Sequence, residues 1–234
     1  MTDAGRAVLA LHATAPSRAS MMNVITSAAT HWCRVGGTFV FLDLSRDRYF
    51  MLEQSAADRF SRIVAGAQEE GDNDWLAARG LHHLAPPVDQ SSSERIAPTS
   101  SVLEEPNLER ASAVETARSV WVLALAQRHV RKLALMEILP NLLHGVPVAP
   151  HVQRSDARQV AAAFKRARHY FSGMDECLSR GVAMRRVLAG KGCEARLVIG
   201  VTLPFAAHCW VQLGSAVLTD PLDVVTPYTP ILVA

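Results

Sequence analysis

The sequence predicts an α+β protein made of two units, and three observations lead to this class. Short apolar runs separated by turn residues occur near both ends of the chain, as in β-hairpins. The region between them has the apolar spacing and composition of long helices. Residues 89–110, which include DQSSSERIAPTSS, are rich in Ser and Pro, which is typical of a linker. We therefore divide the chain into units at 1–88 and 111–234.

Length and composition exclude several functional classes. The chain has 234 residues, of which 49% are hydrophobic and 20% charged, an ordinary globular composition. Its net charge of +2 is too small to indicate a nucleic acid or an anionic membrane as partner. No apolar run approaches the ~18 residues of a membrane-spanning helix, and the N-terminus lacks the pattern of a signal peptide. We expect a cytoplasmic protein.

The N-terminal unit contains a predicted hairpin followed by two short helices. Thr38–Leu44 (TFVFLDL) and Tyr49–Leu52 (YFML) have the composition of strands and flank a polar turn. Helices are predicted from Ser55 to about Ala65 and over Asp74–Arg79. Alternate residues of a hairpin face inward, so about half of its aromatic side chains are expected to be core.

The C-terminal unit is predicted to start with helices over 111–139 and 153–170. A third helix, capped by Asp175, ends at Gly190. The predicted strands follow at Ala195–Val201, His208–Leu213 and Val217–Asp220. Three of the four cysteines are expected to be small buried hydrophobes: Cys33, Cys193 and Cys209.

Cys177, His208 and Asp220 together predict thiol chemistry. Cys177 lies in the first turn of its helix, where partial positive charge favours a thiolate. A histidine can act as the base beside the thiol, and a carboxylate can orient that base. The free N–H groups of the helix could also stabilise an oxyanion. This combination predicts a cysteine peptidase or a related acyl-transfer enzyme that needs neither a metal nor a cofactor.

The proposed triad depends on the register of the last hairpin. A tight two-residue turn would place Asp220 opposite Cys209, on the strand face away from His208. A three-residue loop at Gly214–Ala216 would instead pair Asp220 with Trp210, diagonal to His208 on the same face. We therefore predict an odd-numbered loop or a bulge, and a tight turn without a bulge would count against the triad.

Several motifs resemble those of the B proteins of lasso-peptide biosynthesis. They are CLSR at 177–180, LVIGV at 197–201 and PFAAHCWV at 204–211. B proteins are leader peptidases related to transglutaminase-like and papain-like cysteine peptidases, and the resemblance covers roughly 111–234. It implies that the nucleophile is Cys177, the base His208 and the orienting acid Asp220, with Asp223 as a nearby competitor. Cys209 is a departure, since the family has a small residue such as Ala there.

The N-terminal hairpin resembles a PqqD-like precursor-recognition domain, through GTFVFLDL at 37–44 and YFML after the turn. The resemblance implies a small winged-helix-like domain ahead of a papain/transglutaminase-like domain. Such domains bind a leader peptide as an added strand. The expected contacts with the leader are Tyr49, Phe50, Met51, Leu52 and Trp75.

Together, these resemblances imply a leader peptidase that cleaves a ribosomally made lasso-peptide precursor at the leader–core junction. The implied partners are the precursor peptide and an ATP-dependent, asparagine-synthetase-like lasso cyclase. One alternative is a transglutaminase-like acyltransferase with an amine acceptor, and another is a non-catalytic peptide-binding protein. A zinc site at Cys193, His208 and Cys209 is disfavoured because the last two point to opposite faces of a strand.

Overall fold

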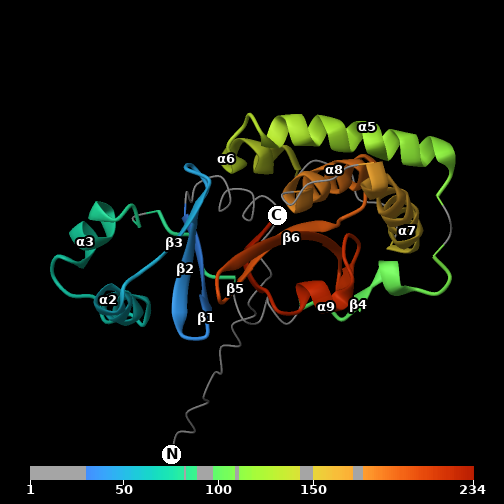
Figure 1. Cartoon of the computed structure of the whole chain (residues 1–234). Coiled ribbons are helices and arrows are strands. Elements are labelled where there is room, and N and C mark those ends of the chain that lie inside the picture. Colours follow the sequence, from blue (N-terminus) through green and yellow to red (C-terminus); the bar gives the residue numbers. More distant parts are fainter. Residues whose placement is uncertain (1–29, 82, 89–96, 109–110, 143–149, 171–175) are drawn as a thin grey trace, which may run out of the picture.

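Two β-sheets organise the part of the chain that this computed structural model describes (Figure 1). The described residues are 30–81, 83–88, 97–108, 111–142, 150–170 and 176–234. One sheet has three strands in the order β1-β2-β3, and the other has five in the order β4-β7-β6-β5-β8. The fold is mixed α+β, as the sequence predicts. The winged-helix-like classification of residues 1–88 stays a prediction.

The N-terminal sheet contains one strand more than the sequence analysis predicted. Its antiparallel strands are β1 (Thr30–Val35), β2 (Thr38–Asp43) and β3 (Arg48–Met51). The additional strand, β1, pairs with β2 through a turn at Gly36 and Gly37, whose φ angles are 55° and 92°. Positive φ at both central residues is what a two-residue hairpin turn of type I′ requires. The Gly-Gly pair was therefore a sequence signal for this strand.

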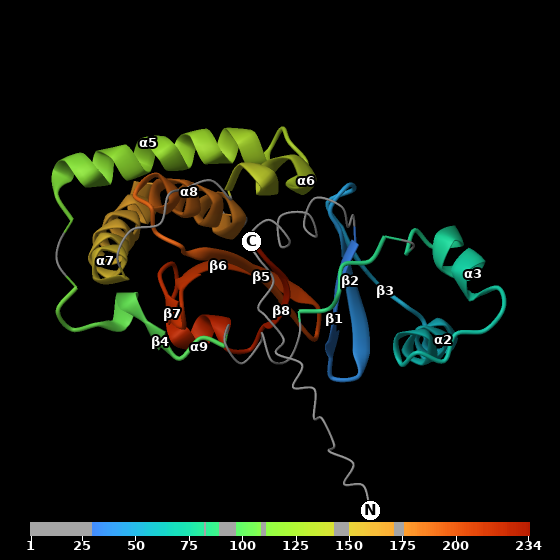
Figure 2. The same ribbon diagram turned by 180° about the vertical axis from the view of Figure 1, so that it is seen from behind.

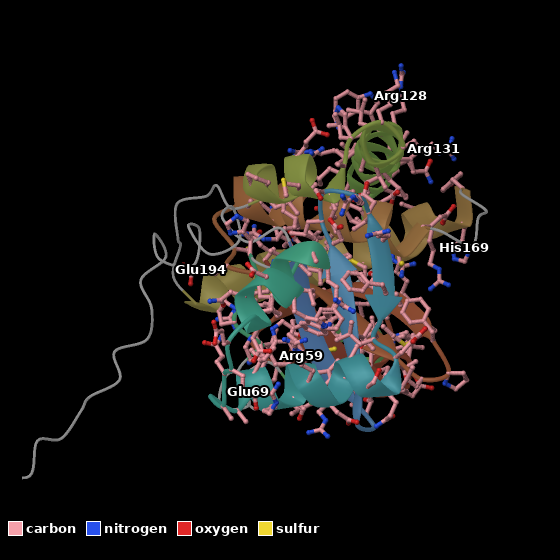
Figure 3. All side chains as sticks on the ribbon, turned by 90° about the vertical axis from the view of Figure 1, so that its left-hand side faces the viewer. Arg59, Glu69, Arg128, Arg131, His169 and Glu194 are labelled. Atoms are coloured by element: carbon pink, nitrogen blue, oxygen red, sulfur yellow. The ribbon has the colours of Figure 1, made fainter. Side chains whose placement is uncertain are left out.

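The two faces of this sheet pack against different parts of the molecule. Phe39 and Phe41 lie against Phe60 of helix α2 (Gln54–Val64), in the cluster that also holds Leu76 of α3 (Asp72–Ala78). The rings of Phe41 and Phe60 are 5.1 Å apart in an edge-to-face arrangement. Figure 3 looks onto this side, with α2 and α3 in front of the blue strands.

The opposite face of the N-terminal sheet packs into the core of the C-terminal unit. Val40 and Leu42 are fully or almost fully buried in the same cluster as Leu197, Ile199 and Leu232. Alternation along β2 separates these side chains from Phe39 and Phe41. The two predicted units therefore share one hydrophobic core, although the division of the chain into domains stays a prediction.

The five-stranded sheet carries the last predicted hairpin in its centre. Its strands are β4 (Ser100–Ser101), β5 (Arg196–Thr202), β6 (Ala206–Leu213), β7 (Ala216–Val217) and β8 (Thr229–Val233). Strands β5 and β6 pair antiparallel, with Gly200 opposite His208. The short strand β4 runs parallel to β7 at one edge, and β8 forms the other. Neither β4 nor β8 was predicted.

Helices cover one face of this sheet, as both sides of the molecule show (Figures 1 and 2). They are α5 (Ala113–Val130), α7 (Pro150–Ala167), α8 (Glu176–Gly190) and the short helix α6 (Leu135–Ile138). The short helix α9 (Leu222–Val225) lies on the opposite face, where Val225 packs with Val198 and Trp210. No helix in the described ranges is both long enough and apolar enough to span a membrane. The predicted cap Asp175 lies outside the described residues.

The helix predicted over 111–139 is interrupted, with α5 ending at Val130 and α6 starting at Leu135. The interruption lets α6 dock on the N-terminal sheet. The backbone N–H of Leu135 donates to Asp47 at 2.8 Å, and that of Met136 donates to the carbonyl of Leu44. Tertiary hydrogen bonds thus replace the helical bonds that periodicity alone would predict.

The second half of the predicted linker is packed structure. Ser101 pairs with Val217 across the β4–β7 ladder, and Val102 is buried. Lys165 of α7 donates to the carbonyl of Leu103 at 3.1 Å. Residues 97–108 therefore belong to the sheet edge rather than to a free linker, because strand pairing outweighs their polar composition; residues 89–96 and 109–110 lie outside the described part.

Candidate active site

Cys177, His208 and Asp220 converge from three different elements. Cys177 is the second residue of α8, His208 lies on β6, and Asp220 follows β7. The Cys177 side chain forms a hydrogen bond with His208, and His208 Nε2 lies 3.4 Å from Asp220 Oδ2. At that distance the second contact is an ion pair, looser than a charge-assisted hydrogen bond of about 2.8 Å. The structure thus brings the three predicted side chains together in the order thiol, imidazole, carboxylate.

The prediction of a three-residue loop in the last hairpin is wrong. Leu213 pairs with Ala216, so the turn consists of Gly214 and Ser215 alone. Gly214 has a φ of 60°, which a tight turn requires. Had the ladder continued regularly, Asp220 would lie opposite Cys209 and face away from His208.

Asp220 reaches His208 because the chain leaves the ladder soon after β7. The backbone N–H of Leu218 still donates to the carbonyl of Val211 at 2.8 Å. The N–H of Val211, however, donates to the side-chain hydroxyl of Thr219 at 3.1 Å. The irregularity that the triad needs therefore follows β7 instead of lying within the turn.

The short length of β7 also makes room for Cys177. Strand β7 pairs with β6 only at Gln212 and Leu213. Among the described residues, the first half of β6 therefore has a strand partner on its β5 edge but none on the edge that faces β7. The backbone N–H of Cys209 donates to the Cys177 sulfur at this edge. Helix α8 approaches closely because it has Gly181, where a Cβ would lie 3.0 Å from Cys209 Sγ.

Arg180 is a fourth side chain in the site, to which the sequence analysis assigned no role. Its Nη2 lies 2.7 Å from Asp220 Oδ1. Arg180 is three residues after Cys177, so both side chains lie on one face of α8. This spacing in CLSR was the sequence signal for the contact. The competing acid Asp223 is exposed on α9, and the structure places Asp220 in the site in its stead.

Aromatic rings flank His208 on the sheet. The ring of Trp210 is 6.4 Å from the imidazole and nearly parallel to it, and the ring of Tyr228 is 5.4 Å away. Trp210 is fully buried, and its Nε1 donates to Gln212 Oε1 at 2.7 Å. These contacts restrict the imidazole to the orientation that faces Cys177 and Asp220.

The electrostatics of the site favour a thiolate–imidazolium pair. Burial opposes ionisation of Cys177, but the hydrogen bond and charge of His208, the Cys209 N–H and Arg180 outweigh it and lower the thiol pKa. Burial would lower the pKa of His208, but the contacts with Asp220 and Cys177 and the charges of these two groups raise it to about 9. Burial likewise opposes ionisation of Asp220, while His208 and Arg180 keep its pKa low.

The remaining cysteines behave as the sequence predicts. Cys33, Cys193 and Cys209 are all buried and unoxidised. Burial raises the pKa of Cys33 to about 12, and it also raises the pKa values of Cys193 and Cys209. Cys177 therefore differs from the other three in its tendency to ionise. Within the described ranges, no three His, Cys, Asp or Glu side chains lie close enough to hold a metal ion.

The residues expected to contact a leader peptide divide between two surfaces of β3. Tyr49 faces the C-terminal unit, with its ring 5.3 Å from that of Phe205. Burial, followed by the nearby Cys209 and Cys177, raises the phenol pKa of Tyr49. Met51, two residues on, is 47% exposed. Their role in binding a leader stays a prediction.

The other expected leader contacts lie on the α2 side of the sheet. Phe50 stacks on Phe41 with ring centroids 4.9 Å apart. Leu52 and Trp75 pack against the same cluster. Two guanidinium groups lie over the Trp75 ring, those of Arg79 at 4.3 Å and Arg59 at 5.1 Å from its centre. Figure 3 shows Arg59 on this side of the molecule.

Comparison with known proteins relates the second half of the chain to a superfamily. Residues 120–233 match the Transglutaminase-like superfamily. The chain therefore contains a transglutaminase-like domain. That domain includes Cys177, Arg180, His208 and Asp220, and it starts within α5.

One curated relative resembles a shorter stretch of the chain. Over 46 residues the chain is 44% identical to the Microcin J25-processing protein McjB of Escherichia coli. The match covers 19% of this chain and 22% of that protein, so only about a fifth of the relative's length is spanned. No solved structure matches the chain.

Proposed function

We propose that this protein is a cysteine peptidase that removes the leader from a ribosomally made lasso-peptide precursor. The observation that carries the proposal is the contact of Cys177 with His208, which lowers the pKa of the thiol. The transglutaminase-like domain supports thiol-based acyl transfer. The similarity to a microcin J25-processing protein supports a peptide precursor as the substrate.

The proposed reaction is acyl transfer in two steps. The Cys177 thiolate attacks the carbonyl carbon of the last leader residue, and the His208 imidazolium protonates the leaving amine as the C–N bond breaks. A water molecule then attacks the thioester, His208 accepts its proton, and the C–S bond breaks. The products are a leader with a free carboxylate and a core with a free α-amine. An ATP-dependent, asparagine-synthetase-like cyclase is the proposed partner that uses this amine.

Recognition of the leader is proposed to occur at the outer edge of β3. Among the described residues, β3 pairs only with β2, so its other edge can accept an additional strand. Tyr49 lies on this strand and is close enough to Cys177 and Cys209 for their charges to raise its pKa. A peptide added along β3 would therefore continue toward the thiol.

The first test is to incubate the full chain with the precursor peptide encoded beside it and to measure the product masses. We expect one cut at the leader–core junction, and loss of at least about 10³-fold in rate for Cys177→Ala. Cys193→Ala is the matched control, because Cys193 is buried away from the triad and should leave cleavage unchanged. An active Cys177→Ala variant would refute the proposed nucleophile.

A second measurement separates the peptidase from the amine-acceptor alternative. In water enriched in ¹⁸O, hydrolysis of the acyl-enzyme puts one heavy oxygen into the new leader carboxylate. An acyltransferase supplied with a primary amine would instead give a leader of higher mass that carries the amine. We expect the labelled carboxylate to dominate even at millimolar amine. A predominant amide product would favour the acyltransferase.

Strand addition at β3 makes a prediction about the leader itself. Residues of an edge strand alternate in forming backbone hydrogen bonds with their neighbour. Leader peptides that are N-methylated at one position at a time should therefore bind alternately well and poorly. Each lost hydrogen bond should raise the Kd of the leader by about fivefold, as measured by titration of labelled peptide. Equal effects at successive positions would argue against strand addition.

A further inference from the structure

We propose that Arg180 is a positioning residue, which holds the Asp220 carboxylate in the orientation that faces His208 and so ties acid, base and nucleophile into one unit. The inference rests on the proposed function of the site and assigns a role to a fourth side chain in it. Arg180 acts through Asp220 in this account and does not itself contact the reacting atoms.

The two carboxylate oxygens of Asp220 have different partners, and the contact with Arg180 is the shorter of the two. Arg180 Nη2 lies 2.7 Å from Oδ1, whereas His208 Nε2 lies 3.4 Å from Oδ2. Both ends of the Arg180–Asp220 pair are shielded from water, with side chains only 13% and 8% exposed. A short charge-assisted bond in such a setting determines where a carboxylate lies. Arg180 therefore decides the position from which Asp220 meets the imidazole.

The position of Asp220 outside the ladder explains why it needs this support. Its carbonyl accepts a hydrogen bond from the Ser101 hydroxyl at 2.7 Å, which anchors the backbone alone. Thr219 adds a side-chain hydrogen bond to the carboxylate. Arg180 links that carboxylate to α8, one helical turn from Cys177. The acid and the nucleophile are thus connected through the same helix.

Arg180 also adds positive charge to a site with several ionisable groups. The groups that face Cys177 are His208 and Cys209 from β6, Tyr49 from β3 and Arg180 from α8. Those that face His208 are Cys177, Asp220 and the ring of Tyr228. Loss of Arg180 should raise the pKa of Cys177 and let the carboxylate turn away from His208, which lowers the pKa of His208. Both shifts favour the uncharged thiol–imidazole pair.

The test measures alkylation of the thiol by iodoacetamide as a function of pH, using the full chain. Cys177 should react selectively, because the other three cysteines are buried and have raised pKa values. We expect Arg180→Gln to slow alkylation at neutral pH by at least about tenfold and to move the profile to higher pH. Arg180→Lys, which keeps the charge, should stay within about threefold of the unmodified chain. An unshifted profile for Arg180→Gln would overturn the proposal.

Arg186→Gln is the matched control on the same helix. Its guanidinium contacts His129 at 3.1 Å, away from the triad, so its profile should equal that of the unmodified chain. A shift as large as that of Arg180→Gln would mean that any arginine loss on α8 perturbs the thiol, and it would overturn a specific role for Arg180.

A double variant tests whether Arg180 acts through Asp220. Adding Arg180→Gln to Asp220→Asn should change the alkylation rate at neutral pH by less than about threefold, because the asparagine leaves Arg180 no carboxylate to hold and only its direct charge effect on Cys177 remains. The double variant also removes both charges of the buried pair, so it remains informative if Arg180→Gln alone fails to fold. A further loss of about tenfold on adding Arg180→Gln, as large as the loss expected in the unmodified chain, would refute action through Asp220.

Alkylation requires no peptide, which separates this inference from the proposed function. An unmodified chain that leaves the precursor uncut, yet shows the Arg180-dependent profile, would reject the peptidase and keep the role of Arg180. Normal cleavage together with an unshifted Arg180→Gln profile would reject the role of Arg180 alone.

Discussion

Environment makes four chemically identical thiols behave differently in this chain. Cys33 is surrounded by apolar side chains, and burial alone raises its pKa to about 12. Cys177 is also largely shielded from water, but His208 supplies a hydrogen bond and a positive charge that outweigh the cost of burial. Reactivity therefore depends on one neighbouring imidazole, whose own pKa is raised by Asp220.

The raised pKa of His208 predicts the alkaline limit of activity. Below about pH 9 the imidazolium is charged and can stabilise the thiolate; above it the proton is lost and no acid remains for the leaving amine. We expect kcat/KM to fall as pH rises through about 9, and to fall again in acid as the thiolate is protonated. Initial rates of precursor cleavage between pH 4 and 10.5 measure both limbs. Activity that still rises at pH 10 would contradict the ion pair.

At the scale of elements, the site depends on close approach between backbones and rings. Gly200 of β5 lies opposite His208, and its missing side chain makes room for the Trp210 ring. A Cβ at this position would lie 2.7 Å from Trp210 Cζ3 and 2.9 Å from Tyr228 Cβ. These are the two rings that flank the imidazole, so the strand pair leaves no space there for even a methyl group.

Gly200→Ala should therefore destabilise the protein and disturb the site together. We expect a loss of about 1–3 kcal/mol in the free energy of unfolding, because Trp210 is fully buried and cannot move aside. Cleavage should weaken as the imidazole shifts. Urea unfolding and initial rates measure the two effects.

Gly190→Ala provides the matched control for that substitution. Gly190 ends α8, and an added Cβ meets nothing within 4 Å. The free energy of unfolding should stay equal or rise slightly, because alanine restricts the unfolded chain. Equal stability for Gly200→Ala and Gly190→Ala would refute the steric argument.

At the scale of the whole molecule, one face of the N-terminal sheet packs into the same hydrophobic cluster as the transglutaminase-like domain. Leu42 is 1% exposed and belongs to the same cluster as Leu197 of β5. Removal of residues 1–88 would uncover this face, so deletion would test folding as well as leader binding. Single substitutions are the better test of the packing between the two sheets, because they leave the rest of the chain in place.

Leu42→Ala should destabilise both sheets at once. We expect a loss of about 2–4 kcal/mol, with β2 and β5 losing protection together in hydrogen exchange read by mass spectrometry. The exposed Val64→Ala on α2 should change stability by less than about 0.5 kcal/mol. Loss of protection confined to residues 30–81 would instead indicate two independent domains.

Local patterns account for the elements that were predicted correctly. Alternation and turn residues located β2 and β3, and apolar spacing located α7 and α8. Strand β4 was missed because two serines carry little strand signal until a partner is present. Strand β8 contains strand-favouring residues, but Pro230 interrupts the pattern, and Pro is tolerated there because β8 lies at the edge of the sheet. Strand β1 was missed although Gly36 and Gly37 marked its turn.

The residue types of the candidate site could be chosen from the sequence, since thiol, imidazole and carboxylate occurred in suitable local structures. The arrangement of these groups in space could not be predicted from the sequence. The hairpin has the tight turn that strand parity alone disfavours, and Asp220 meets His208 because the chain leaves the ladder after β7. Arg180 completes the site through a contact 40 residues distant in sequence. Periodicity describes neighbours along the chain, whereas such departures are decided by side chains that meet across the fold.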